Sequence, residues 1–253
     1  MNIDERLKDI AFYQYHPEYL PFIGEKFDEY RILHIGESHF LDQSKSDATI
    51  SLKDLEGWWT GQENPKIAEQ SKESNYTTRN IVNRYMNVKR TKAHGIFTNV
   101  ARSFSENILG ESGLSPEAAS KNYKYFAFMN FFQQPSLYKG ASYWEALRYA
   151  TNEDRKKHPV ASELWAECAC HSARVLDAVI DILEPKLVIF TSKSATEAYR
   201  DDCKNGKHAK EKDLVIYTYH PGSPYWNRPG QLTENKTGRE AFEDALKTLK
   251  PKG

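Results

Sequence analysis

The chain has few of the features that mark secreted, membrane-spanning or metal-rich proteins. Its three cysteines, Cys168, Cys170 and Cys203, are too few and too unevenly spaced for a disulfide framework or a four-cysteine metal site. No apolar run approaches the roughly 20 residues of a membrane-spanning helix, and the first residues have no signal-peptide core. We therefore expect a cytoplasmic protein that binds no membrane and needs no metal or other cofactor.

The chain also lacks an excess of charge of either sign. Lysine and arginine number 35, as do aspartate and glutamate, so the formal net charge at pH 7 is +0. No overall positive field then attracts the protein to DNA or to anionic lipid. Any contact with nucleic acid has to be local.

Aromatic residues are abundant in an otherwise polar chain. Hydrophobic residues make up only 39%, yet five Trp, 15 Tyr and 12 Phe separate the composition from that of disordered proteins. A length of 253 residues is ample for one sizeable domain with a buried core. We expect a single domain over residues 1–253, enlarged by polar excursions at about 41–95 and 110–122.

Short apolar runs rich in β-branched and aromatic residues predict four buried strands. These runs are Ile32–Ile35, Tyr125–Met129, Leu187–Phe190 and Leu214–Tyr219. Helical spacing of apolar residues predicts a long helix from about Leu164 to Ile182, ended by Pro185, and shorter helices over 78–86, 96–109, 142–150, 194–200 and 238–249. The alternation favours a three-layer α/β/α fold with a four-stranded, mainly parallel central sheet.

Functional groups in such a fold gather after the carboxyl ends of the strands. The first predicted strand is followed by Gly36 and then by Glu37, Ser38, His39 and Phe40, a dense set of reactive side chains. A glycine at this position permits a tight turn. We expect a functional site there.

Two other predicted strands also end in polar residues. Asn130, whose amide both donates and accepts hydrogen bonds, ends the second strand, and His220 ends the fourth. Since the ends of parallel strands meet at one edge, Glu37, Asn130 and His220 are expected to share a pocket for a planar polar ligand. The loop after His220 carries further polar and aromatic residues that could contact nucleic acid, namely Ser223, Tyr225, Trp226 and Arg228.

The order of these segments resembles that of the uracil-DNA glycosylase superfamily. ILHIGESHF (32–40) is similar to its first motif, YFAFMNFF (125–132) to its base-recognising strand, and YHPGSPYWN (219–227) to its second, His-Pro-Ser-type motif. The segment 162–199 between them is similar to the long helix, Pro-Lys strand and following helix of the iron-sulfur branch. The resemblance covers about half of the chain and implies a uracil-DNA glycosylase-like fold.

The resemblance also implies a reaction, in which a damaged base is extruded from DNA and its bond to the sugar is hydrolysed. Glu37 would orient the water and stabilise the oxocarbenium-like sugar, and His220 would stabilise the departing base. Asn130 would read the edge of uracil, and Phe40 would stack on it, with Trp58 or Trp59 as competitors for stacking. The expected partner is DNA with a damaged base, or a free nucleobase or nucleotide.

Several positions depart from the family pattern. Ser38 stands where the first motif usually has its catalytic aspartate, which makes Glu37 the best candidate base, and His39 replaces a proline. We expect Ser38 and His39 to border the base. Gly222 is inserted into the second motif, which alters the setting of the proposed DNA contacts. Of the cluster-ligand positions, only Cys168 is retained, so no iron-sulfur cluster is expected.

Other readings of the same residues remain open. Glu37 could cap a helix or turn, while Asn130 and His220 could serve only as hydrogen-bonded structural residues. The protein could then be a non-catalytic module that binds a nucleobase, a nucleotide or single-stranded nucleic acid. It could also hydrolyse small nucleotides without DNA. Clustering of Lys and Arg around the mouth near Arg228 would favour the DNA substrate.

Overall fold

The computed structural model describes residues 2–41, 51–72, 77–87, 95–137, 142–151, 159–202, 206–209, 211 and 214–249. At its centre is a five-stranded sheet in the order β1-β3-β2-β4-β5. The strands are β1 (Phe22–Ile23), β2 (Ile32–Phe40), β3 (Phe126–Ser136), β4 (Leu187–Phe190) and β5 (Val215–Tyr217). Strands β3, β2, β4 and β5 are mutually parallel, and β1 is antiparallel to β3.

The four strands predicted from apolar runs are confirmed, but the prediction of a four-stranded sheet is wrong. The additional strand, β1, pairs only Phe22 with Phe128 and Ile23 with Ala127. A strand of two residues is too short to produce an alternating pattern, so its sequence gave no signal. The protein is therefore an α/β fold with a mixed sheet.

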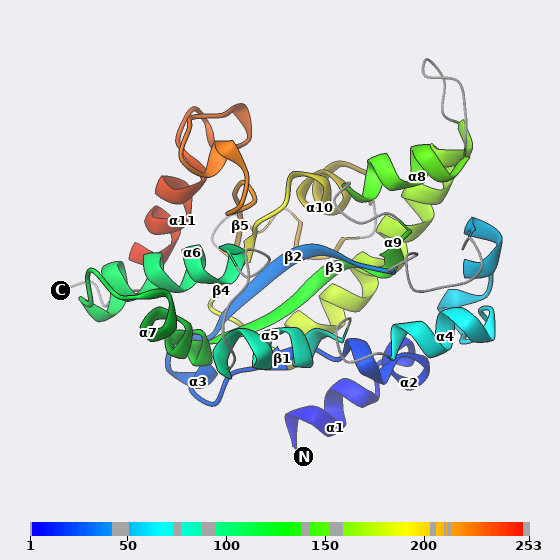
Figure 1. Cartoon of the computed structure of the whole chain (residues 1–253), viewed down its shortest axis with the longest axis horizontal. Coiled ribbons are helices and arrows are strands. Elements are labelled where there is room, and N and C mark those ends of the chain that lie inside the picture. The colour runs from blue at the N-terminus through cyan, green and yellow to red at the C-terminus, as the bar shows by residue number, and fades with distance from the viewer. Residues whose placement is uncertain are drawn as a thin grey trace.

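The two faces of the sheet follow from the alternation of side chains along each strand. On β2, Leu33 and Ile35 belong to one buried cluster, whereas Ile32 belongs to the other. All eleven residues of β3 are buried, as expected for a strand covered on both faces. The sheet is thus the middle layer between two groups of helices (Figure 1).

One face is covered by the long helix α9 together with helices from both halves of the chain. The members with buried side chains in this cluster are α1 (Ile3–Lys8), α2 (Ala11–Tyr15), α3 (Phe27–Tyr30), α4 (Pro65–Ser71), α8 (Tyr143–Thr151), α9 (Pro159–Leu183) and α10 (Lys193–Glu197). Helix α9 packs directly on β3, the strand next to the centre. Its predicted amphipathic pattern is confirmed, and the helix ends two residues before Pro185.

The other face is covered by α5 (Thr78–Asn87), α6 (Gly95–Phe104), α7 (Pro116–Lys121) and α11 (Gly238–Lys247). Figure 1 shows α6, α7 and α11 on one side of β2 and β3, with α8 and α9 on the other. Single π-helical turns, Ser105–Leu109 and Ala198–Asp202, extend α6 and α10. Helix α7 lies within the excursion expected at 110–122, and α4 and α5 lie within the excursion expected at 41–95.

Short 3-10 turns connect several of these elements, at Pro17–Tyr19, Leu52–Leu55, Trp58–Thr60, Asn122–Tyr125, Pro224–Trp226 and Gln231–Thr233. Within the ranges that the structure describes, none of the helices combines the length and apolarity that crossing a bilayer requires. Cys203 lies outside the described residues.

Candidate functional site

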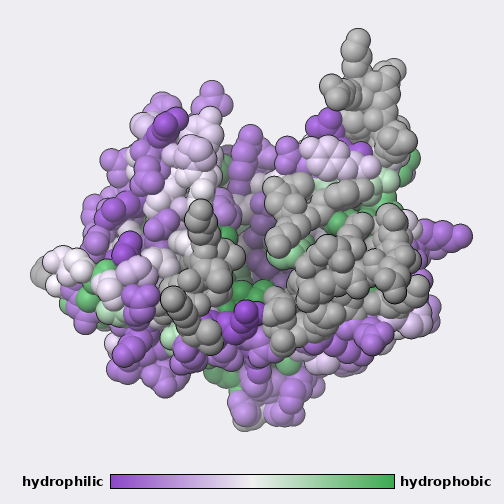
Figure 2. All heavy atoms as spheres, viewed as in Figure 1, coloured by the Kyte–Doolittle hydropathy of each residue, from purple (hydrophilic) through white to green (hydrophobic). Residues whose placement is uncertain are grey.

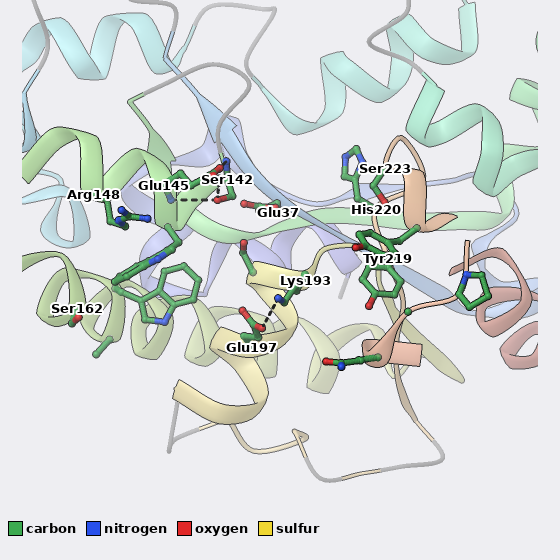
Figure 3. A pocket seen from close by; sticks show the side chains of 18 of the residues that line it. Glu37, Ser142, Glu145, Arg148, Ser162, Lys193, Glu197, Tyr219, His220 and Ser223 are labelled. Carbon is green, nitrogen blue, oxygen red and sulfur yellow. Dashed lines mark hydrogen bonds and ion pairs between the residues drawn. The ribbon is translucent and has the colours of Figure 1, made fainter. Parts of the chain in front are cut away.

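A cleft with a volume of about 1160 Å³, here called the central cleft, opens at the carboxyl ends of the parallel strands. Its walls come from the end of β2, from α8, α9 and α10, and from the loop after β5 (Figure 3). Figure 2 shows the corresponding hollow between the parts of the molecule that carry α11 and α8, where most of the described surface is hydrophilic. Its described lining residues are Glu37, Ser142, Trp144, Glu145, Arg148, Ser162, Trp165, Ala166, Lys193, Ser194, Glu197, Tyr219, His220, Ser223, Tyr225, Pro229, Gly230, Gln231 and Asn235.

Both carboxylate oxygens of Glu37 accept hydrogen bonds from the starts of helices. The backbone N–H of Tyr143, the first residue of α8, donates to Oε1 over 2.6 Å. The hydroxyl of Ser192 donates to Oε2 over 2.7 Å. The Oγ of Ser192 also caps α10, because it accepts a hydrogen bond from the backbone N–H of Ala195. Partial positive charge at a helix start stabilises a carboxylate. Glu37 therefore joins α8 and α10 to the end of β2.

The environment of Glu37 raises the pKa of its carboxyl above the ordinary value. Burial is the largest cause, and the hydrogen bonds from Ser192, Tyr143 and Ser194 oppose it, while the nearby carboxylate of Glu145 adds to it. Burial disfavours the charged form, and donors to the carboxylate favour it. A carboxyl whose pKa is moved toward neutrality is better suited to act as a general base.

His220 offers a neutral N–H donor at the wall of the central cleft. The backbone N–H of Gly222 donates to Nδ1 over 3.0 Å, so the proton of the neutral ring resides on Nε2. Burial lowers the pKa of His220, which keeps the ring neutral at neutral pH. Nε2 has no hydrogen-bond partner among the described residues, so its proton is available to a ligand.

Gly222 therefore has a specific place beside this histidine. A Cβ at position 222 would lie 3.1 Å from Cε1 and 3.2 Å from Nδ1 of His220, which is tight. The glycine lets the backbone approach the ring closely enough to donate. The loop after β5 is also fixed by Asn99 of α6, whose side-chain amide donates a hydrogen bond to the carbonyl of Pro221 over 2.8 Å.

His34 forms a fully buried hydrogen-bond chain on β2. Thr191 Oγ1 donates to the carbonyl of Ile35, so it accepts from Nε2 of His34 over 2.7 Å. Nδ1 of His34 then accepts from the hydroxyl of Tyr123 over 2.6 Å. Burial lowers the pKa of His34 to about 3, and repulsion from His220 contributes. His34 is therefore an interior histidine whose two ring nitrogens are both hydrogen-bonded.

Asn130 lies on the opposite face of the sheet from Glu37. It pairs with Gly36 in the parallel register, and a Cβ on Gly36 would be 2.3 Å from its Oδ1. Asn130 is 8% exposed and its amide makes no hydrogen bond within the described part of the chain. Asn130 is not among the described residues that line the central cleft. The structure thus brings Glu37 and His220, but not Asn130, to this cleft.

The residues that follow Glu37 on β2 face other surroundings. His39 is 3% exposed, its Nε2 is 3.1 Å from Thr78 Oγ1, and its ring centroid is 4.5 Å from that of Tyr19. Ser38 and Phe40 are half-buried and pair with β3. Ser38, His39 and Phe40 are likewise not among the described residues of the cleft wall.

The expected DNA contacts separate into two groups. Ser223 and Tyr225 line the central cleft, and the buried Oγ of Ser223 has no hydrogen-bond partner among the described residues. Tyr225 is 50% exposed and stacks on Tyr219 with ring centroids 4.9 Å apart. Trp226 is 3% exposed and packs on Phe242 instead.

Arg228 is exposed. Neither Arg228 nor Trp226 is among the described residues that line the cleft. Tyr219 lines the cleft, whereas Phe131 and Phe132 are fully buried. Trp58 is also fully buried and stacks on His16, and Trp59 stacks on His171. Neither tryptophan lies among the described residues of the cleft.

Several cleft residues were missed by the sequence reasoning. Lys193 and Ser194 come shortly after β4, so applying the strand-end rule to this strand would have found them. Trp144, Arg148 and Trp165 come from α8 and α9, and their positions depend on how those helices pack. No local pattern in the sequence indicated them.

The charges in the central cleft are nearly balanced. Its described walls carry the carboxyls of Glu37, Glu145 and Glu197 against the cations of Arg148 and Lys193. Lys193 Nζ lies 3.5 Å from Glu197 Oε1. The described cleft wall therefore lacks the cluster of unpaired cations that binds a chain of phosphates.

Cys168 belongs to a buried polar group on the α9 side of the sheet. Its Sγ lies 2.9 Å from Gln134 Oε1, and the hydroxyl of Tyr143 lies 2.8 Å from the same oxygen. Burial raises the pKa of the Cys168 thiol to about 12, so it stays protonated. Cys170 is half-buried, consistent with the two cysteines pointing to different faces of α9.

Comparison of the chain with protein-family models, curated protein sequences and solved structures finds no match.

Proposed function

We propose that this protein hydrolyses the N-glycosidic bond of uracil or another deaminated base in DNA. The observation that carries the proposal is the presence of Glu37 and His220 in one cleft at the strand ends. A carboxyl with a raised pKa and a neutral N–H donor are the two groups that such a hydrolysis needs.

Each residue has a defined part in the proposed reaction. Glu37 accepts a proton from the attacking water and stabilises the positive charge that develops on the sugar. The Nε2–H of His220 donates to the base oxygen as negative charge develops on the departing base. The reaction needs no metal or cofactor, because both charges are stabilised by protein groups.

Two polar groups without partners bear on the ligand, Ser223 at the wall of the central cleft and Asn130 outside that wall. The buried Oγ of Ser223 at the cleft wall and the amide of Asn130 are both left without a hydrogen bond among the described residues. Buried polar groups are normally hydrogen-bonded, so the unpaired Oγ of Ser223 at the cleft wall is a place where a ligand or water would complete the site. Asn130 reads the base only if the base reaches the face of the sheet on which it lies. Tyr219 and Tyr225 are better placed than Phe40 to stack on a base in the cleft.

A second candidate substrate is a free nucleoside or nucleotide, and the balance of charge in the central cleft favours it. Double-stranded DNA is held mostly by contacts from cations to phosphate oxygens. The cleft offers Arg148 and Lys193 against three carboxylates, which suits a small ligand better than a duplex. The chemistry at Glu37 and His220 is the same for either substrate.

The test is to incubate the purified protein with single- and double-stranded oligonucleotides containing uracil, and separately with deoxyuridine and its monophosphate. Abasic sites are measured by alkaline strand cleavage, and free uracil by chromatography. We expect Glu37→Gln to lower the rate by about 100-fold or more, and His220→Ala by a similar factor. Glu25→Gln is the matched control, since Glu25 is exposed and follows β1 near the start of β3.

The outcomes separate the proposals. Release of uracil that is unchanged in Glu37→Gln would overturn the assigned mechanism. Release from deoxyuridine but not from oligonucleotides would replace the DNA substrate with the small one. Tight binding of a uracil oligonucleotide with no release of base by the wild-type protein would establish a binding module and end the enzymatic proposal.

A further inference from the structure

Ser192 occupies a fixed position between Glu37 and α10. It is 0% exposed and is the N-cap residue of that helix. Its oxygen accepts the backbone N–H of Ala195 over 3.2 Å, and its single proton is donated to Oε2 of Glu37 over 2.7 Å. Because the helix occupies a lone pair of the oxygen, the hydroxyl is held pointing at the carboxylate.

The burial of Ser192 separates its role from that of its neighbours. Ser194 and Lys193 line the central cleft, whereas Ser192 is not among the described lining residues. A fully buried hydroxyl cannot reach a ligand in the cleft, so it does not act as a nucleophile there. Its effect on a reaction has to pass through Glu37.

We propose that Ser192 is a positioning residue for Glu37, which orients the carboxylate toward the cleft and favours its ionised form. This inference rests on the proposed function, in which ionised Glu37 is the base. A hydrogen bond to the charged form of a carboxyl stabilises that form, and here it opposes the effect of burial. Besides Ser192, the backbone N–H of Tyr143 and the hydroxyl of Ser194 donate to this carboxylate, and the charge of Glu145 acts on it. Lys193, Glu197 and His220 line the same cleft.

The first measurement is the pH dependence of uracil release by Ser192 variants. Loss of the donor in Ser192→Ala raises the pH at which Glu37 ionises, so the acidic limb of the profile should move up by about one pH unit. Ser192→Gly should give the same shift, and it keeps a residue that is favourable at an N-cap. Ser192→Thr retains the hydroxyl and should restore the wild-type profile.

Thr196→Val is the matched control for loss of a buried hydroxyl on the same helix. Thr196 is 1% exposed and donates to the carbonyl of Ser192 over 2.7 Å, with no bond to Glu37. We expect this variant to leave the acidic limb in place. A merely structural role of Ser192 predicts similar profiles for Ser192→Gly and Thr196→Val, with lower stability in both.

The second measurement is independent of catalysis. The side-chain carboxyl carbon of Glu37 is followed by ¹³C NMR during a pH titration, with Glu37→Gln used to assign the signal. The titration should move to higher pH in Ser192→Ala and Ser192→Gly and should return in Ser192→Thr.

The two measurements distinguish failure of the inference from failure of the proposed function. An unchanged Glu37 titration in both Ser192→Ala and Ser192→Gly overturns the positioning role, whether or not the protein releases uracil. An equal shift in Thr196→Val also overturns it. A wild-type protein that releases no base fails the proposed function, and the NMR titration then still decides whether Ser192 controls the ionisation of Glu37.

Discussion

The buried tyrosines of this protein allow a sharp test of its hydrogen-bond geometry. Tyr123 and Tyr13 are 0% and 1% exposed, so Tyr→Phe removes one buried hydroxyl oxygen in each case. The hydroxyl of Tyr123 donates to His34 Nδ1 over 2.6 Å, whereas the hydroxyl of Tyr13 has no partner among the described residues. The same chemical change should therefore have different effects on stability at the two sites.

The magnitudes follow from what each substitution leaves behind. Tyr123→Phe leaves the buried Nδ1 of His34 without a donor, which should cost about 1–3 kcal/mol. The ring of Tyr123 stays stacked on Phe126 at 5.1 Å, so little packing is lost. Tyr13→Phe removes a hydroxyl that is itself unpaired and leaves no other group without a partner. The free energy of unfolding of this variant should therefore equal that of the wild type or exceed it by up to about 1 kcal/mol.

Urea-induced unfolding of the wild type and both variants at pH 7, followed by tryptophan fluorescence, measures the difference. Equal slopes with denaturant concentration would show that the unfolding transition is comparable in the three proteins. A destabilisation by Tyr13→Phe as large as that by Tyr123→Phe would contradict the assigned hydrogen bond of Tyr123 and the unpaired hydroxyl of Tyr13. A cost of less than about 0.5 kcal/mol for Tyr123→Phe would contradict the hydrogen bond to His34 as well, because a buried acceptor cannot lose its donor at so small a cost.

Two further predictions concern Asn130 and the pH dependence of stability. Gly36→Ala would place a Cβ 2.3 Å from Asn130 Oδ1 and so displace that side chain. If Asn130 reads the base, uracil release should fall by about 10-fold or more. A wild-type rate in this variant would exclude that role. The folded-state pKa of His34 is lowered to about 3, so this residue contributes stability that is present above its unfolded pKa of 6.5 and is lost as pH falls from there toward 3. As the pH falls below 6, the unfolding free energy of the wild type should decrease more steeply than that of His34→Gln, by roughly 1.4 kcal/mol for each pH unit. His220, whose pKa is also lowered, contributes a decrease in the same direction in both proteins. Parallel pH profiles for the two would contradict the assignment.

The fold was predictable where local patterns suffice. The four parallel strands and α9 carry continuous apolar runs or helical periodicity, and each was found. The predicted ends of β2 and β3, at Ile35 and Met129, were nevertheless too early, because these strands continue to Phe40 and Ser136. By contrast, α1, α2, α3 and α4 are at most seven residues long, and short amphipathic segments give little periodic signal. Strand β1 was missed for the same reason.

The candidate site was predictable only where it follows strand order. Glu37 and His220 end up in one cleft because parallel strands bring their carboxyl ends to the same edge. Asn130 was predicted to end its strand, but β3 continues to Ser136, so the alternation of the pleat decides which face Asn130 occupies. An error in the predicted end of a strand therefore changes which residues share a pocket.

The capping and catalytic interpretations of Glu37 are both compatible with the geometry, and Glu37→Gln separates them. In that variant the amide oxygen can still accept from the backbone of Tyr143, and the amide N–H can donate to Ser192 Oγ, which has a second lone pair. The variant also avoids burying a charge, so its free energy of unfolding should lie within about 1 kcal/mol of the wild type. Glu37→Ala removes both acceptors, and urea-induced unfolding should show a cost of about 2–4 kcal/mol.

A protein that keeps its stability in Glu37→Gln but loses uracil release needs the ionised carboxylate for chemistry, because capping alone would be satisfied by the amide. Loss of stability in Glu37→Gln equal to that in Glu37→Ala would instead show that the charge itself holds α8 and α10, and a fall in activity would then carry no information about catalysis.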